Sequence, residues 1–382
     1  MSNNNSDTKI DYRFKILYAL GIFFVVSGHC QNGGISILYD WFPPYAFHLA
    51  LFTFCSGYFY KSDNKSIFDY IKGKIKRLVL PYYAWNLFYA VFVVLMSYIG
   101  FKIGNKPTLY NFFIEPFLTG HQYMYNLGGW YALSLFLILS VNIILRKLSL
   151  RIFKKVNEPI YFLFCLSVGF IGVYFASIGY NTGFFLLIAK FSYLFTFFAL
   201  GIFYRKVLEK YDNMSNIVYY SIIFGFVLFI AAFYGMIPAY TPACCNDFKN
   251  GPFMPFITAL PGIFFWLRTA RLLEPFIGKN KYLNLVADHS YSIMINHFLG
   301  FMIVKSLGFV ITSLAGIQYM FDIYKFQTDI YYFFTGYMSN FLIIYTAAGI
   351  IVPIIISLAI NHIHQKFIKL LNKAKKSTTD GF

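Results

Sequence analysis

The chain has 382 residues, of which 58% are hydrophobic and only 12% are charged, and its net charge is +17. Soluble globular domains carry about twice this charged fraction. Such a small number of charged side chains does not cover the surface of a soluble protein with so apolar a core, and a disordered chain is excluded as well. The composition therefore places the chain in a lipid bilayer.

Ten largely apolar stretches have lengths near the roughly 20 residues that a helix needs to cross a bilayer. They cover residues 14–30, 42–60, 78–100, 128–148, 159–179, 183–204, 216–237, 253–271, 289–312 and 338–362. No long hydrophilic block separates them. We therefore expect one all-α, polytopic membrane bundle of about ten helices at 14–362, between an N-terminal segment, 1–13, and a basic tail, 363–382.

Basic residues gather on one side of this bundle if the chain begins in the cytoplasm and every stretch crosses once. Of the 32 Lys and Arg residues, four then lie outside and two lie within spans, which leaves 26 in the inner segments. Short cytoplasmic loops show this bias. We therefore expect both termini in the cytoplasm. The positive charge is explained by the orientation of the protein in the membrane and by contact with anionic lipid headgroups, rather than by binding to nucleic acid.

The first two spans each carry a histidine. In the first span, Lys15, Tyr18 and His29 share one helical face, which leads from the cytoplasmic side to an imidazole near the opposite side. The second span follows after a short connector and carries His48, so both rings are expected in the outer half. A single membrane histidine often makes only a hydrogen bond between helices. Two in one hairpin favour a functional site.

Further polar residues lie at or inside the ends of spans. Lys74, Lys76 and Arg77 stand where an inner loop enters the third span. These cations either serve only to orient the protein in the membrane, or they face a phosphorylated ligand. Trp130 belongs either to the interfacial aromatic belt or to a site. His297 lies too deep for such a belt, so it needs a polar cavity or a buried hydrogen bond.

Other residue types predict no site of their own. His121, in an outer loop, is expected to be an ordinary solvated residue. The five cysteines have neither metal-ligand spacing nor a disulfide framework, and no metal site is predicted. They are Cys30, Cys55, Cys165, Cys244 and Cys245.

Five short strings follow one another along the chain: GIFFVVSGH at 21–29, FHLALFTFCSGY at 47–58, KRLVLPY at 76–82, WYAL at 130–133, and YSI at 291–293 with His297. In this order they resemble the acyltransferase-3 family of integral membrane acyltransferases, in particular its branch similar to fucose 4-O-acetylases. The resemblance covers residues 11–362. It implies a transmembrane acyltransferase domain in the bacterial cytoplasmic (inner) membrane. Its partners would be cytoplasmic acyl-CoA, usually acetyl-CoA, and a sugar hydroxyl of a surface glycan or lipid-linked oligosaccharide.

The resemblance also implies roles for individual residues. His29 and His48 would be catalytic. Lys74, Lys76 and Arg77 would bind the acyl-CoA donor, and no tightly bound cofactor is expected. The family commonly places Arg or Lys eleven residues before the first-helix histidine, where this chain has Tyr18, so Lys15 is the expected substitute. The possible lining of the site consists of Tyr18, Ser56, Tyr82, Trp130 and His297.

Imidazole suits acyl transfer because it takes a proton from a hydroxyl or carries the acyl group itself, and both routes stay open. One alternative is a transporter or flippase of a sugar or lipid-linked glycan, with the histidines as a proton relay. Another is a catalytically silent subunit of a polysaccharide synthase. Transporters often have repeated halves. Residues 14–179 and 183–362 show no convincing repeat, so we favour the enzyme.

Overall fold

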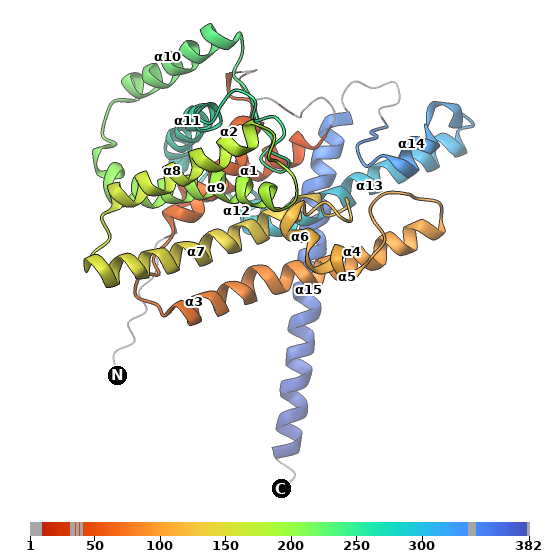
Figure 1. Ribbon diagram of the computed structural model, residues 1–382. Coiled ribbons are helices and arrows are strands. Elements are labelled where there is room, and N and C mark those ends of the chain that lie inside the picture. Colours follow the sequence, from red (N-terminus) through yellow and green to blue (C-terminus); the bar gives the residue numbers. More distant parts are fainter. Residues whose placement is uncertain (1–9, 31–34, 36–37, 39–40, 335–340, 380–382) are drawn as a thin grey trace.

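The computed structural model describes residues 10–30, 35, 38, 41–334 and 341–379, and within them the chain forms helices and no strands (Figure 1). The predicted all-α fold class is thereby confirmed. Residues 1–9 of the expected N-terminal segment, 338–340 of the last expected span and 380–382 of the tail lie outside the described part. Residues 363–379 of the expected tail continue the last helix.

Each of the ten expected apolar stretches falls on a helix. The long helices are α1 (Tyr12–Gly28), α2 (Pro44–Tyr58), α4 (Leu80–Tyr98), α7 (Trp130–Phe153), α8 (Glu158–Ser177), α9 (Gly183–Phe203), α10 (Asn216–Tyr234), α11 (Met254–Ile277), α13 (Ser290–Leu314) and α15 (Phe341–Thr379). The short elements are α3 (Ile67–Lys74), η3 (Ile75–Val79), α5 (Leu109–Phe113), α6 (Glu115–Leu118), η4 (Leu127–Gly129), η5 (Tyr204–Leu208), η6 (Glu209–Tyr211), α12 (Lys281–Asp288), η7 (Gln318–Met320) and α14 (Ile323–Thr328).

Within the described residues, eight helical stretches are long and apolar enough to cross a membrane. The helices α1 and α2, with 17 and 15 residues, are shorter than these. A multispanning membrane protein therefore follows from the helices, while the count of ten crossings stays a prediction. Figure 1 shows α15 crossing the other helices and extending beyond them at its C-terminal end.

Local chemistry explains where several helices begin. The side chain of Asp11 accepts a hydrogen bond from the backbone N–H of Arg13 at the start of α1. Ser66 caps α3 and Asn157 caps α8 in the same way. These side chains satisfy N–H groups that have no partner in the first helical turn. Along the eight stretches that are apolar enough to cross a membrane, apolar side chains predominate, as lipid contact requires.

The helices α2 and α9 approach each other closely because each has a glycine at the crossing. A Cβ atom on Gly57 would lie 1.9 Å from the carbonyl oxygen of Phe198, and one on Gly201 would lie 2.0 Å from that of Phe54. Small residues allow such close contacts between membrane helices. The crossing fixes the position of α2, which carries His48.

Ion pairs connect the segments that were expected on the cytoplasmic side. In the described part of the chain, every ion pair between different elements joins two of these segments. The pairs are Arg146 with Asp63 and Glu158, Lys206 with the same two carboxylates, Arg268 and Arg271 with Asp212, Lys15 with Asp288, and Arg13 with Glu209. The expected inner segments therefore meet at one end of the bundle.

Connecting segments meet one another at the opposite end. The N–H of Asn105 donates to the carbonyl oxygen of Gln122 at 2.7 Å, and the N–H of Lys102 donates to that of Gln327 at 2.7 Å. The buried ammonium of Lys305, on α13, donates to the carbonyl oxygen of Ile330 at 2.5 Å. These bonds hold the segments around 101–126 and 321–334 against the bundle.

Candidate functional site

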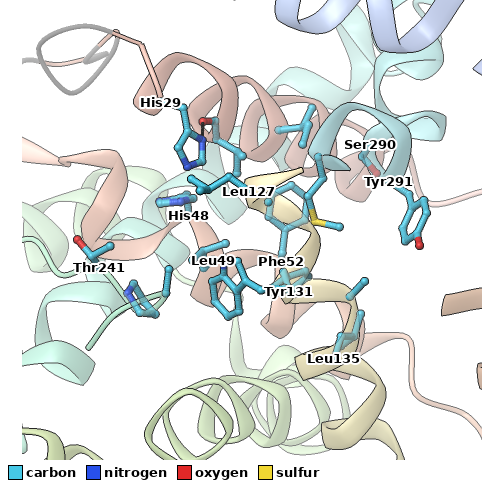
Figure 2. A pocket seen from close by; sticks show the side chains of 18 of the residues that line it. His29, His48, Leu49, Phe52, Leu127, Tyr131, Leu135, Thr241, Ser290 and Tyr291 are labelled. Carbon is cyan, nitrogen blue, oxygen red and sulfur yellow. Dashed lines mark hydrogen bonds between the residues drawn. The ribbon is translucent and has the colours of Figure 1, made fainter. Parts of the chain in front are cut away.

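A cavity of about 260 Å³ lies among α1, α2, α7 and α13, and we call it the histidine cavity (Figure 2). On this side its wall is formed by Tyr18, Ile22 and Val25 of α1 and by His29, which directly follows α1. Tyr18 and His29 therefore face the cavity together, as their helical spacing predicted. The helix α2 contributes a face of its own. That face consists of Tyr45, His48, Leu49, Phe52 and Ser56.

His29 and His48 have the same hydrogen-bonding arrangement. Nδ1 of His29 lies 2.8 Å from the carbonyl oxygen of Val25, and Nδ1 of His48 lies 2.6 Å from that of Pro44. A carbonyl oxygen only accepts, so Nδ1 donates its proton in each ring and Nε2 keeps an unprotonated lone pair. Figure 2 shows the two rings close together on the cavity wall. The cavity thus offers two basic nitrogens to a ligand.

His297 lies behind His29 and is not on the cavity wall. The centroids of the two rings are 4.9 Å apart. Nδ1 of His297 lies 3.0 Å from the carbonyl oxygens of Ile293 and Met294, while its buried Nε2 has no hydrogen-bond partner among the described residues. His297 therefore packs against the back of the site rather than facing a ligand.

His121 joins the histidine cavity from the loop between α6 and η4. Burial lowers its pKa to about 4, with smaller contributions from Lys190 and His29, so the ring is neutral at physiological pH. Its Nε2 is buried and has no partner in the described part of the chain. This position differs from the solvated one that the outer loop suggested. No pattern in the sequence separates it from an ordinary loop histidine.

The loop between α10 and α11 closes one side of the histidine cavity through Thr241, Pro242, Ala243 and Cys244. The N–H of Thr241 donates to the carboxylate of Asp247 at 2.5 Å. The N–H groups of Cys244 and Cys245 donate to the carbonyl oxygen of Thr241, at 3.1 and 2.9 Å. The segment is therefore an ordered turn, although it has no periodic pattern that marks it in the sequence.

Trp130 and Tyr82 occupy different places around the histidine cavity. Trp130, at the start of α7, lines it, and its ring lies 5.1 Å from the ammonium of Lys190, which is buried on α9. Tyr82 does not line this cavity. Its hydroxyl accepts a hydrogen bond from Gln122 at 3.3 Å, and its ring packs at Gly129. Lys190 had no predicted role.

A second cavity, of about 270 Å³, lies between α2, α3, η3 and α7, and we call it the basic cavity. Lys74 and Arg77 line it. Among the described residues, neither cation pairs with a carboxylate, in contrast to Arg146 and Lys206 at the same end of the bundle. Lys74 lies over the ring of Tyr70 at 5.2 Å. The two cations are therefore available to an anionic ligand.

A one-turn π-helix, η3, carries Arg77 at the mouth of the basic cavity. The N–H of Leu80 donates to the carbonyl oxygen of Ile75, and Pro81, the next residue, has no N–H to donate. Short π-helices within α-helices are frequent at functional sites. The string KRLVLPY thus covers the end of a π-helical turn and the start of α4 rather than one continuous α-helix.

Two other expected donor-binding residues lie away from both cavities. Lys15 forms an ion pair with Asp288 on α12. Lys76 is exposed and lines neither cavity. The structure therefore groups Lys74 with Arg77 and separates Lys15 and Lys76 from them.

The histidine cavity and the basic cavity adjoin each other. Tyr18, Ser56, Leu78 and Leu135 line both. Tyr18 lies on α1 and His29 directly follows it, and their separation of eleven residues corresponds to about 16 Å of helical rise. The wall that α1 contributes therefore runs from the junction of the two cavities, at Tyr18, toward His29.

Charge and metal-ligating groups are scarce around His29 and His48. None of the described residues that line the histidine cavity is Asp, Glu, Lys or Arg. Across the described part of the chain, no group of three or more His, Cys, Asp or Glu side chains is placed to hold a metal ion. The chemistry that these residues offer is therefore that of neutral imidazoles and hydroxyl groups.

Comparison with known proteins gives one match. The acyltransferase-3 family model, described as an acyltransferase domain, matches residues 11–362. No curated protein and no solved structure matches the chain. The matched range contains every residue that lines the two cavities.

Proposed function

Because the chain belongs to the acyltransferase-3 family, we propose that it is a membrane O-acyltransferase of the fucose 4-O-acetylase-like branch. It moves an acyl group, most simply acetyl, from cytoplasmic acyl-CoA to a hydroxyl of a cell-surface or lipid-linked glycan. The observation that carries the proposal is the junction of the two cavities. One is lined by Lys74 and Arg77, which pair with no carboxylate among the described residues, and the other by imidazoles whose Nε2 lone pairs are free to accept a proton.

The proposed location is the bacterial inner membrane, with ten crossings and both termini in the cytoplasm. The helices α1 and α2 then cross as a pair despite their short lengths. Two independent features support this orientation. The basic residues concentrate in alternate segments, and the ion pairs of the described residues join those same segments at one end of the bundle.

The donor binds at the basic cavity in this scheme. Phosphate groups of acyl-CoA contact Lys74 and Arg77, and charge-assisted hydrogen bonds of this kind are strong. Lys65 lies within electrostatic range of Lys74 and adds to the positive potential. The pantetheine arm extends past Tyr18 into the histidine cavity, so the thioester meets His29 while the nucleotide stays on the cytoplasmic side.

His29 is the proposed general base. Its Nε2 takes the proton of the acceptor hydroxyl as the hydroxyl oxygen bonds to the thioester carbonyl carbon. The tetrahedral intermediate then expels the sulfur of CoA, and the proton on His29 passes to that sulfur. The products are an ester and free CoA. The other route, an acyl group carried on His29, would leave acylated protein when donor is present and acceptor is absent.

The acceptor is proposed to reach His29 from the end opposite the basic cavity, where Thr241, Cys244, His121 and Tyr331 line the wall. An uncharged wall favours an uncharged ligand, because a charge buried there would have no counter-ion. The reacting sugar is therefore proposed to be neutral near its reacting hydroxyl.

The proposal is tested by NMR of surface and lipid-linked glycans from cells with the wild-type protein, without it, and with His29→Ala. We expect one ester to be absent in the last two samples while the sugar chain remains. The protein level in the membrane is measured in each. A transporter or flippase instead predicts loss of the glycan itself from the surface. A silent subunit predicts normal acylation with His29→Ala, and either result would reject the enzyme.

A further inference from the structure

Hydroxyl groups from three helices meet where the histidine cavity joins the basic cavity. Tyr18 on α1 and Ser56 on α2 line both cavities, and Tyr131 on α7 lines the histidine cavity. The hydroxyls of Tyr18 and Tyr131 both lie near the side chain of Ser56. The hydroxyl of Tyr131 lies 3.1 Å from Oγ1 of Thr53. We call Tyr18, Thr53, Ser56 and Tyr131 the hydroxyl ring.

Aromatic faces complete this section of the bundle. The centroid of the Phe52 ring lies 5.8 Å from that of Tyr18 and 6.3 Å from that of Tyr131. A Cβ atom on Gly21 would lie 3.0 Å from the Phe52 ring, so α1 passes close to this ring. The hydroxyl ring is therefore set among flat apolar surfaces.

The hydroxyl ring has hydrogen-bonding capacity that its internal bonds do not use. Oγ1 of Thr53 donates to the carbonyl oxygen of Leu49 at 2.9 Å, and Oγ of Ser56 donates to that of Phe52 at 3.0 Å. Because the single proton of Thr53 is used in this way, the hydroxyl of Tyr131 donates to Oγ1 of Thr53. The oxygens of Tyr131 and Ser56 can still accept from a ligand, and the hydroxyl of Tyr18 can donate to one. Because the hydroxyl ring carries no charge, it suits neutral ligand groups that both donate and accept hydrogen bonds.

We propose that the hydroxyl ring binds the amide groups of the pantetheine arm of acyl-CoA, an inference that rests on the proposed function. A thioester that approaches His29 from a nucleotide at Lys74 and Arg77 passes this section of the bundle. The arm between nucleotide and sulfur contains two neutral amides, each with one donor and one acceptor. Its methylene groups match the faces of Tyr18, Phe52 and Tyr131.

The test compares two donors with the full-length protein in lipid nanodiscs. Acetyl-CoA carries the nucleotide and the arm, whereas S-acetylpantetheine carries the arm alone. For Tyr18→Phe with Ser56→Ala we expect KM to rise about 10-fold for both donors, as expected for the loss of one or two neutral hydrogen bonds, with kcat nearly unchanged. Lys74→Ala with Arg77→Ala should raise KM for acetyl-CoA only.

Ser167→Ala is the matched control. Ser167 on α8 donates to the carbonyl oxygen four residues earlier, Leu163, at 3.0 Å, as Ser56 does to Phe52, but it lines neither cavity. It should leave KM unchanged for both donors. Tyr18→Phe alone retains the aromatic ring, so it serves as the test if the double variant does not insert.

The possible results separate the inference from the proposed function. If wild type transfers acetyl while the hydroxyl variants keep the wild-type KM for S-acetylpantetheine, the inference is overturned and the proposed function stands. A fall in kcat at constant KM would also overturn it, because it would place the hydroxyls in the chemical step. If wild type transfers acetyl from neither donor, the proposed function fails and the inference fails with it.

Discussion

The ring of His297 packs against the ring of His29, with centroids 4.9 Å apart and planes tilted by 31°. His29 follows the last residue of α1, whereas His297 lies within α13. The contact therefore ties the orientation of the cavity histidine to a second helix. Phe298 packs against both rings, at 5.4 Å from His29 and 4.6 Å from His297.

Replacing His297 tests whether this packing positions His29. For His297→Phe we expect kcat to fall by about 10- to 100-fold with little change in KM, because a small displacement of a catalytic group is costly. Steady-state kinetics with acetyl-CoA measure both constants. His289→Phe is the control, since His289 bonds to Ser357 and lines neither cavity. An unchanged kcat for His297→Phe would show that the stacking only fills space.

His29 and His48 should contribute unequally. His48 is only 4% exposed, whereas His29 is half-buried and more open to a ligand. For His29→Ala we expect the rate of acyl transfer to fall by about 10²- to 10⁴-fold, the usual contribution of a general base. For His48→Ala we expect a fall of about 10-fold, typical of one lost hydrogen bond near the reacting groups. Single-turnover measurements give both rates. Equal losses would show instead that the two rings act as one unit.

The sequence predicted the helices well because lipid imposes a strong constraint on them. Every backbone polar group in a membrane needs a partner within the protein, so each long apolar run becomes a helix. The helical face of Tyr18 and His29 followed from spacing alone. The same spacing also placed Lys15 on that face, yet Lys15 pairs with Asp288, 273 residues later in the chain. Such distant partners are not visible in local periodicity.

The loops around the site were the part that the sequence did not predict. His121 and Thr241–Cys244 reach the histidine cavity through connections that have no repeating pattern. Their positions depend on how separate loops pack together. Lys190 is one of the two basic residues within the expected spans, and its place beside Trp130 follows from the packing of α9 against α7.

The two cations of the basic cavity give a prediction for donor binding, and Lys76, which lies between them in the sequence, provides its control. Lys74→Ala with Arg77→Ala should raise KM for acetyl-CoA by about 10- to 100-fold, because hydrogen bonds to charged groups are lost. Lys76→Ala removes one cation from the same inner segment but from outside both cavities, so its KM should stay near wild type. Equal effects of Lys76→Ala and Lys74→Ala would indicate that these cations serve orientation alone.

Acid should weaken the ion-pair cluster at the inner end. Asp63 is half-buried, and burial by itself would raise the pKa of its carboxyl group. The hydrogen bonds and charges of Arg146 and Lys206 outweigh this effect and lower the pKa to about 2. A lowered folded-state pKa stabilises the fold above pH 4, and this stabilisation is lost as the pH falls from 4 toward 2. Asp63→Asn should therefore lower Tm at pH 7. It should also make Tm depend less steeply on pH between pH 4 and 2.

Thermal unfolding in detergent across this pH range measures the effect on Tm. Asp69→Asn is the control, because Asp69 is exposed and its side chain bonds only to Ser66 among the described residues. It should leave the slope as in wild type. If Asp63→Asn keeps the wild-type slope, other carboxylates cause the acid sensitivity.

Cys244 provides a test of the outer mouth and of the orientation together. All five cysteines are described, and only Cys244 is not fully buried. A membrane-impermeant maleimide added to intact cells, after permeabilisation of any outer membrane, should label Cys244. Burial raises the pKa of its thiol, so labelling should be slow at pH 7 and faster at pH 8.5. Cys244→Ala should abolish the labelling.

The label should also stop acyl transfer, because Cys244 and His48 line the same cavity and a bulky adduct would occupy the path of the acceptor. Acyl transfer by the Cys244→Ala variant should be insensitive to the reagent, which makes this variant the control for reaction elsewhere. Labelling of wild type only in inverted vesicles would reverse the proposed orientation. Full labelling with undiminished acyl transfer would instead show that the acceptor does not pass the loop at 241–244, because a bulky adduct on Cys244 would then leave the reaction of the sugar unaffected.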